Sequence, residues 1–161
     1  MKSILWGIFT GALVFSDLKC KSYVENNYEK IQKKEICLGK VEVRRVHNKG
    51  MMLNKGEKYP ETVRLASMLA CMIAGIQAIV EWERGRSALK KLGVALTFAG
   101  AISNTYDRLR RKYVVDYFAF KSKDPSINRV TFNLADMFIF IGSILLIVAT
   151  LFGCGTKKRR R

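Results

Sequence analysis

The sequence predicts an all-α membrane protein with four transmembrane helices and a small extramembrane β-sheet or hairpin element. Hydrophobic residues make up 49% of the 161 residues. They gather in four long runs, unlike the short periodic patterns of a soluble globule. The runs cover residues 4–15, 65–80, 92–102 and 134–152. Because the chain has the length of one domain and contains no repeat or linker, we expect a single polytopic domain over residues 1–161.

The first helix is expected over residues 3–24. Its apolar run is shorter than the roughly 20 residues that span a bilayer, so the helix has to continue past Asp17 and Lys21. These two residues are four apart on one helix face, where opposite charges can pair. Residues 14–16 form a poor cleavage site for a signal peptide, which favours a retained helix.

Residues 25–60 form a polar, basic segment that is expected outside the bilayer. Within it, residues 36–46 alternate apolar and polar side chains on both sides of Gly39 and Lys40. This pattern predicts a β-hairpin with a two-residue turn.

The second and third helices are expected over residues 61–82 and 88–106. Pro60 is well placed at the start of the second helix. The N–H of the first helical residue has no hydrogen-bond partner within the helix, and proline lacks this N–H. Small residues recur along this helix and allow close packing between helices in lipid.

A second outer segment is expected over residues 107–132. Its portion 113–120 is rich in aromatic and β-branched residues, which predicts a strand. The fourth helix is expected over residues 133–152, and a basic cytoplasmic tail follows over residues 153–161.

The net charge of +16 indicates an anionic partner. No nucleic-acid-binding module is visible and the basic residues flank apolar runs, so phospholipid headgroups are the expected counter-charge. Four helices return both termini to one side of the membrane. That side carries ten Lys and Arg residues, whereas eighteen lie toward the other side, eleven in residues 18–62 and seven in residues 105–131. The positive-inside rule alone therefore does not favour cytoplasmic termini.

Polar and charged residues that are costly at a membrane edge gather where the later helices begin or end. Gly100-Ala101-Ile102-Ser103-Asn104-Thr105-Tyr106-Asp107-Arg108 closes the third apolar run. Val114-Val115-Asp116-Tyr117 follows in the predicted strand, and Phe132-Asn133-Leu134-Ala135-Asp136 opens the fourth run.

These blocks resemble the lipoprotein signal peptidases (signal peptidase II), which are membrane aspartyl proteases of bacteria. That family carries G-[GA]-x-[GS]-N-x-x-D-R, V-[VI]-D-[FY] and F-N-x-A-D blocks in this order. Asp17-Leu18-Lys19-Cys20-Lys21 is similar to a fourth element of the family, with Cys20 at a hydroxyl position. Asn48-Lys49-Gly50 is similar to a fifth. The residues after Gly50, Met51-Met52-Leu53, depart from the small residues that the family usually shows there.

The resemblance implies a role for each matching residue. Asp116 and Asp136 would form the catalytic pair, because two neighbouring carboxylates hold one proton between them and act as base and acid. The implied substrate-binding residues are Asn48, Gly50, Asn104, Arg108, Asn133 and Ala135. The implied supporting residues are Asp17, Lys21, Gly100 and Asp107, the last as a partner for Arg108 or a nearby backbone amide.

The resemblance also implies a function. The protein would remove signal peptides from prolipoproteins by cutting just before the lipid-modified cysteine. The site would lie at the outer face of the cytoplasmic membrane, with both termini in the cytoplasm. Expected partners are lipid-modified prolipoproteins and membrane phospholipids, and a monomer is expected.

The sequence contains few of the residues that other classes of catalytic chemistry require. His47 is the single histidine, so neither a zinc site nor a Ser/His/Asp triad is expected, and His47 itself is expected in an interfacial loop. The four cysteines show no metal-ligand spacing, and no cofactor is expected. Two alternatives stay open: an inactive family member that holds lipidated peptides, and a structural or transport membrane module.

Overall fold

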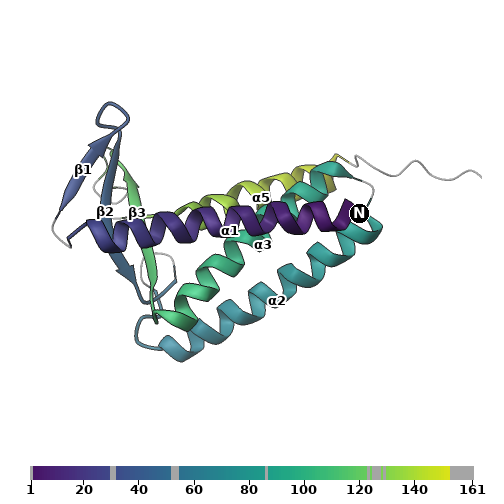
Figure 1. The fold of residues 1–161 in the computed structure, drawn as a ribbon, viewed down its shortest axis with the longest axis horizontal. Helices are drawn as coiled ribbons and strands as arrows, with labels where there is room; N and C mark the ends of the chain where they lie inside the picture. The colour runs from purple at the N-terminus through teal and green to yellow at the C-terminus, as the bar shows by residue number, and fades with distance from the viewer. Residues whose placement is uncertain are drawn as a thin grey trace, which may run out of the picture.

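The computed structural model describes residues 2–29, 32–51, 55–85, 87–122, 124, 128 and 130–152. Within these residues a bundle of long helices carries a small sheet at one end (Figure 1). The helices are α1 (Lys2–Asn27), α2 (Pro60–Arg84), α3 (Ala88–Arg110) and α5 (Leu134–Leu151), and the strands are β1 (Lys33–Ile36), β2 (Val41–Asn48) and β3 (Val114–Phe120). Each helix includes most of the range expected for it. The expected tail, residues 153–161, lies outside the described residues.

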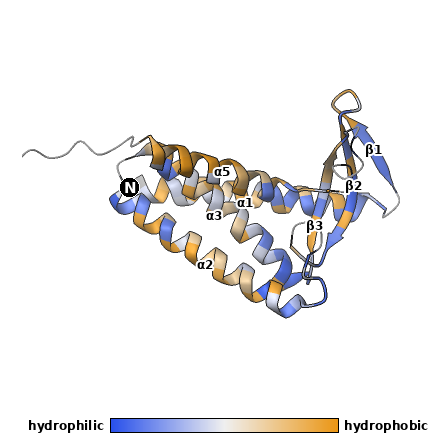
Figure 2. Cartoon of the chain, turned by 180° about the vertical axis from the view of Figure 1, so that it is seen from behind, coloured by the Kyte–Doolittle hydropathy of each residue, from blue (hydrophilic) through white to orange (hydrophobic). Residues whose placement is uncertain are grey.

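Three of the helices in the described part of the chain are long and apolar enough to cross a membrane. They are α1 over Ser3–Asn27, α2 and α5. The sequence predicts four such helices, and three of them qualify. The helix that does not qualify is α3, which carries Lys90 and Lys91 near its start and Asp107, Arg108 and Arg110 near its end. Figure 2 shows the contrast: α5 is hydrophobic along most of its length, whereas α3 is largely pale or polar.

The lower hydropathy of α3 follows from its place in the bundle. Its buried residues are mostly small or polar, including Gly93, Ala95, Ala99, Gly100 and Ser103. Such residues let neighbouring helices approach closely. Helix α3 therefore presents protein-facing surface where the outer helices present apolar side chains.

Helices α3 and α5 approach most closely at glycines. A Cβ atom added at Gly100 would lie 2.3 Å from the carbonyl oxygen of Ala135. One added at Gly142 would lie 2.5 Å from Thr97 Oγ1 and 2.7 Å from the carbonyl oxygen of Gly93. Because real side chains cannot be this close, glycine at these positions determines the distance between the two helices.

The sheet is antiparallel, with the strand order β1-β2-β3. The predicted strand over residues 113–120 is confirmed as β3. The predicted hairpin is also present, but its two-residue turn is wrong: Ile36 pairs with Val41, which leaves a four-residue loop over residues 37–40. Cys37, Leu38 and Gly39 all have positive φ angles in this loop. The loop conformation therefore depends on three left-handed residues, which the Gly39-Lys40 pair alone does not indicate.

The pairing of β2 with β3 places the sheet over the bundle. Asn48 pairs with Val114 and Val46 with Asp116, so two segments about 70 residues apart lie side by side. A buried cluster of Val24, Val115 and Tyr117 attaches β3 to the end of α1. The sheet thus lies over the ends of α1 and α3 and the start of α5, and the end of β2 lies close to them.

Candidate active site

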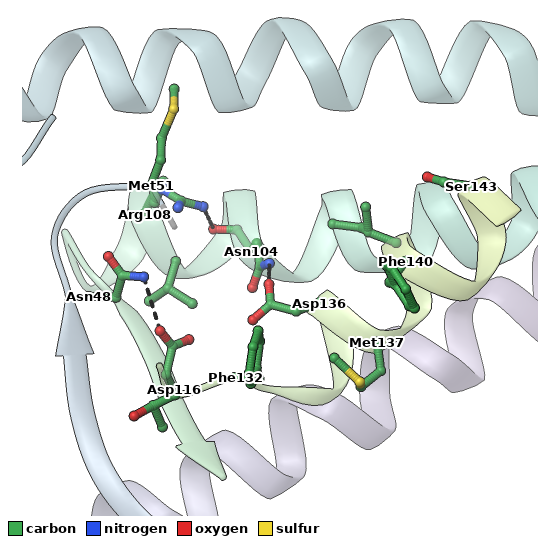
Figure 3. A pocket seen from close by; sticks show the side chains of 13 residues that line it. Asn48, Met51, Asn104, Arg108, Asp116, Phe132, Asp136, Met137, Phe140 and Ser143 are labelled. Atoms are coloured by element: carbon green, nitrogen blue, oxygen red, sulfur yellow. Dashed lines mark hydrogen bonds between the residues drawn. The ribbon is translucent and has the colours of Figure 1, made fainter. Parts of the chain in front are cut away.

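A cavity of about 350 Å³ lies at the junction of the sheet with α3 and α5. Its polar wall carries Asn48, Asn104, Arg108, Asp116 and Asp136, and its apolar wall includes Met51, Phe132, Met137, Ile139 and Phe140. Figure 3 shows Asp116 and Asp136 entering this space from β3 and α5. Two carboxyl groups thus share one largely apolar chamber.

Asp116 lies in the middle of β3 and is 3% exposed. Its Oδ2 atom accepts a hydrogen bond of 3.0 Å from Asn48 Nδ2, and its Oδ1 atom accepts one of 2.7 Å from Asn133 Nδ2. Burial, followed by the nearby charge of Asp136, raises the pKa of Asp116 from its ordinary value to about 7. Near neutral pH this carboxyl group is therefore divided between its protonated and ionised forms.

Asp136 is held by the start of α5. Asn133 caps the helix: its side chain accepts a hydrogen bond from the Asp136 N–H, and its own N–H donates to Asp136 Oδ2 at 3.1 Å. This reciprocal capping box satisfies the free amides of a helix start. Because Asn133 also donates to Asp116, one asparagine connects both carboxyl groups.

Asn104 binds the other oxygen of Asp136. Its Nδ2 atom donates to Asp136 Oδ1 at 2.9 Å, and its Oδ1 atom accepts from Lys21 Nζ at 2.9 Å. The ammonium group can only donate, so it orients the Asn104 amide with its NH₂ toward Asp136.

The ammonium group of Lys21 is fully buried under the site. Lys21 Nζ lies 2.8 Å from Asp17 Oδ2, as their spacing predicted, and 3.2 Å from Asp107 Oδ2. Ser103 Oγ accepts from Lys21 at 3.2 Å and donates to Asp17 at 2.6 Å. A buried charge is tolerated only when it is paired in this way. The network joins α1 to α3 at the depth of the cavity.

Asp107 and Tyr117 extend this network to the sheet. Asp107 pairs with Arg111 at 3.0 Å and accepts a hydrogen bond from the Val115 amide. Of the two partners expected for Asp107, the structure gives the backbone amide and adds Arg111. Tyr117 donates to Asp17 and accepts from the amide of Leu134, so it connects α1, β3 and α5. Burial raises the pKa of Tyr117 above its ordinary value, so the phenol keeps its proton.

Arg108 connects α3 to the loop after β2. Its Nη2 atom donates to the carbonyl oxygen of Gly50 at 3.0 Å, and the Gly50 N–H donates to Asn48 Oδ1 at 3.1 Å. The loop is thereby held beside Asn48, which contacts Asp116. Met51 lines the cavity, whereas Met52 and Leu53 lie outside the described residues.

Not every residue expected at the site faces the cavity. Ala135 is fully buried, with its carbonyl against Gly100, and neither residue lines the chamber. Gly50 is likewise buried beside the chamber and contacts Arg108 through its backbone. Asn133 is fully buried between the two aspartates. These four residues shape the site from behind its walls.

Sequence reasoning missed Ser103 and Tyr117. Both lie inside the sequence blocks described above, Ser103 beside Asn104 and Tyr117 beside Asp116. Their contacts with Asp17 are visible only in the folded chain. It also missed the apolar wall on α5. There Met137, Phe140 and Ser143 line the cavity at a three-residue spacing. This spacing places them on one helix face and is the signal that could have identified them.

His47 lies in strand β2, and its expected place in a loop is wrong. Its Nε2 atom is 3.0 Å from Glu25 Oε1, and its ring stacks on Tyr113 with 4.0 Å between centroids. The phenol of Tyr113 donates to the same carboxylate. This cluster fastens β2 to the end of α1, one residue before Asn48.

The fold and the site together define a multi-pass membrane protein with two buried carboxyl groups facing one cavity at an end of its bundle. Residues 9–152 match the model of the signal peptidase (SPase) II family. Since this match covers most of the chain, the protein belongs to the signal peptidase II family.

Curated relatives agree with this assignment. The chain is 29% identical over 140 residues to the lipoprotein signal peptidase of Lactiplantibacillus plantarum, covering 87% of this chain and 89% of that protein. It is 34% identical over 109 residues to that of Brucella ovis, covering 68% and 66%. The match to the Clostridium acetobutylicum relative, 32% identical over 88 residues, covers 55% of this chain and 56% of that protein.

Two solved structures share the fold. A bacterial membrane enzyme determined by the in meso method at 2.3 Å resolution superposes with a TM-score of 0.78 and 22% identity, covering 99% of this chain and 93% of that one. A second, determined at 1.9 Å, gives a TM-score of 0.72 at 23% identity over 92% of each chain.

Proposed function

We propose that the protein is an aspartic endopeptidase that removes signal peptides from prolipoproteins by cutting before the diacylglyceryl-modified cysteine. The observation that carries this proposal is the pair of buried carboxyl groups, Asp116 and Asp136, in one apolar-walled cavity. Membership of the signal peptidase II family supports the choice of substrate.

The reaction needs one ionised and one protonated carboxyl group. The ionised group takes a proton from a water molecule, whose oxygen attacks the carbonyl carbon of the scissile amide. The protonated group gives its proton to the carbonyl oxygen, which forms a tetrahedral gem-diol. As this intermediate collapses, the carboxyl group that is now protonated gives its proton to the leaving nitrogen and the C–N bond breaks. The other carboxylate takes a proton from one hydroxyl group as the C=O bond reforms, which restores one ionised and one protonated group. The raised pKa of Asp116 supports such a division of one proton near neutral pH.

The surrounding amides fix the geometry of the pair. Asn48 and Asn133 hold the two oxygens of Asp116, and Asn104 with the Asn133 backbone holds those of Asp136. Because both carboxylates are oriented before substrate arrives, little reorganisation is needed in the transition state. The apolar wall on α5 supplies a surface for the hydrophobic part of the substrate.

In this proposal α3 is a fourth membrane crossing. Helix α2 begins beside the sheet and ends at the far end of the bundle, whereas β3 is a strand of the sheet itself (Figure 1). The chain between them has to return along the bundle, and α3, at 23 residues, is about 34 Å long. Its neighbours shield its polar residues from lipid. The sheet and the carboxyl pair then face the outside of the cytoplasmic membrane, and the start of α1 and the end of α5 face the cytoplasm.

The deciding experiment is cleavage of a purified lipid-modified precursor in detergent micelles. The expected product begins with the lipid-modified cysteine, as read by mass spectrometry. Binding of the precursor without cleavage would indicate an inactive family member, and absence of both would leave a structural membrane module.

A further inference from the structure

A second cavity, of about 250 Å³, lies on the outer side of Arg108. It sits where α2 begins and α3 ends. Four of its lining residues are basic, namely Lys49, Arg64, Arg108 and Lys112, and the single acid among them is Glu61. Figure 2 shows polar residues gathered at this corner of the bundle, beside the sheet. We propose that this cavity, called here the cationic pocket, binds the phosphate of an anionic phospholipid headgroup.

The charges favour an anion. The wall carries four basic side chains and one carboxylate, Glu61, which pairs with Arg64. The Nε atom of Arg108 is buried and has no hydrogen-bond partner among the residues that the structure describes. A buried donor without a partner costs free energy, and an anion that accepted a hydrogen bond from this atom would recover it.

The surroundings of the pocket favour a lipid over a free anion. On α2, Leu65, Met68 and Leu69 follow Arg64 and are exposed, and Leu109 is exposed on α3. Tyr59, directly before α2, and Tyr106 on α3 are exposed as well, and tyrosine is enriched at membrane interfaces. A phosphate in the pocket would therefore stand above a surface that acyl chains can cover. Binding of anionic headgroups would also give a specific role to some of the basic residues in excess on the sheet side.

The pocket shares a wall with the catalytic cavity. Arg108 lines both, and its other contacts go to Gly50 and to the backbone of Asn104. A headgroup bound to Arg108 would thus contact the residue that holds the loop beside Asn48. Lipid binding is measured without turnover, so its failure would leave the proposed peptidase activity untouched.

The test uses full-length protein in detergent micelles, with native mass spectrometry counting bound phosphatidylglycerol or phosphatidylcholine. We expect the wild type to retain phosphatidylglycerol in preference, and Arg64→Gln with Lys112→Gln to lower its affinity about tenfold or more. Lys34→Gln with Arg110→Gln removes the same charge elsewhere on the sheet side and should keep wild-type affinity.

Two further measurements distinguish loss of the lipid site from damage to the fold, and a lipid site from a site for free anions. Glu61→Gln removes the one acid of the pocket and should tighten phosphatidylglycerol binding, which damage to the fold would not do. Inorganic phosphate should bind far more weakly than phosphatidylglycerol. Equal binding of inorganic phosphate, equal loss in both double variants, or unchanged affinity in the Arg64/Lys112 variant would each overturn the proposal.

Discussion

At the scale of single residues, the site is organised by hydrogen bonds that leave each carboxyl oxygen with a defined donor. Asn133 is central because it contacts both aspartates and caps α5. Lys21 acts one step further away by orienting Asn104. The chemistry that we propose depends on Asp116 and Asp136 alone, so their replacement gives the first prediction.

Asp116→Asn and Asp136→Asn should each abolish cleavage while the protein still inserts and folds. An amide can neither take a proton from water nor give one to the carbonyl oxygen, so the remaining carboxyl group cannot perform both steps. Cleavage of a lipidated precursor, followed with the melting temperature of each variant, checks this. The exposed carboxylate of Asp124, in the same outer segment, provides the matched control: Asp124→Asn should cleave at the wild-type rate. If either the Asp116→Asn or the Asp136→Asn variant cleaves at the wild-type rate, the assignment of these two residues as the catalytic pair is wrong.

The rate of cleavage should fall as the pH rises through about 7. The raised pKa of Asp116 means that this group keeps its proton up to about pH 7 and loses it above. Above that pH Asp116 no longer carries the proton that the reaction needs, so kcat/KM should decline on the alkaline side. His47, the single histidine, is the other group to exclude, and its replacement by Gln should leave the alkaline limb in place. A limb that disappears with His47→Gln would contradict its assignment to Asp116.

Asn104→Ala and Arg108→Ala should lower activity more than stability. Asn104 donates directly to Asp136, and Arg108 holds Gly50 beside Asn48. A polar contact used in the transition state contributes about 2–4 kcal/mol, which corresponds to roughly 30- to 1000-fold in kcat/KM. The measurement compares kcat/KM with the melting temperature. A loss of folded protein that accounts for the lost rate would make both residues purely structural.

At the scale of elements, the apolar runs predicted the helices, because burial in lipid imposes long hydrophobic segments on α1, α2 and α5. The sequence pattern was less informative where tertiary contacts decide. The loop at residues 37–40 depends on three positive φ angles, and the β2–β3 pairing joins distant segments. Helix α3 was expected from its apolar run, but its neighbours replace lipid as its surroundings, and its hydropathy is too low for it to qualify as a membrane-spanning helix.

Gly100→Ala and Gly142→Ala should destabilise the protein, because each added Cβ would collide with the backbone or a side chain of the facing helix. Overpacking of this kind costs typically about 1–3 kcal/mol. Gly100→Ala should also reduce activity, since Ala135 would be displaced next to Asp136. Thermal unfolding in detergent measures the first effect. Gly11→Ala is the matched control, because nothing lies within 4 Å of a Cβ there, and its melting temperature should not fall. Equal melting temperatures for all three variants would contradict the close α3–α5 packing.

At the scale of the whole molecule, every block noted in the sequence arrives at the same end of the bundle as the sheet. Asp17, Asn104 and Asp136 come from three helices, whereas Asn48 and Asp116 come from two paired strands. The resemblance identified these residues by their order along the chain. Their convergence follows from alternating helix directions. The pairing of Lys21 with Asp17 was predicted from their spacing, whereas the contacts of Ser103 and Tyr117 with Asp17 required the folded structure.

The orientation of the molecule can be tested with a native reporter. Cys37 lies exposed in the loop between β1 and β2, on the side that we propose to be outside. In a variant that keeps Cys37 as its single cysteine, a membrane-impermeant maleimide should label intact cells. A second variant, with Arg159→Cys as its single cysteine, should be labelled only after permeabilisation. The opposite pattern would reverse the topology, as the excess of basic residues on the sheet side would favour.

The last prediction is that the substrate must carry its lipid. The carboxyl pair lies at the end of the bundle, so the scissile bond has to be held at that depth. The apolar helix of a signal peptide can lie against the exposed side chains of α2 and α5, but it fixes the bond only along the membrane normal. Acyl chains on the adjacent cysteine would add a second anchor, with each buried CH₂ contributing about 0.8 kcal/mol. Met137, Ile139 and Phe140 provide an apolar wall beside Asp136 for such an anchor.

Two anchors on either side of the bond would fix its position over Asp116 and Asp136, where a displacement of about 1 Å can cost about 100-fold in rate. A precursor without its diacylglyceryl group should therefore be cleaved about 100-fold more slowly than the lipidated one. The comparison uses both precursors at equal concentration in the same micelles, with the Asp116→Asn protein as the blank for each. If the two precursors are cleaved at the same rate, the protein is a general protease of the membrane edge, and the proposed specificity for lipoproteins is wrong. Loss of cleavage for the unlipidated precursor alone would show that the diacylglyceryl group decides substrate choice, since nothing else differs between the two reactions.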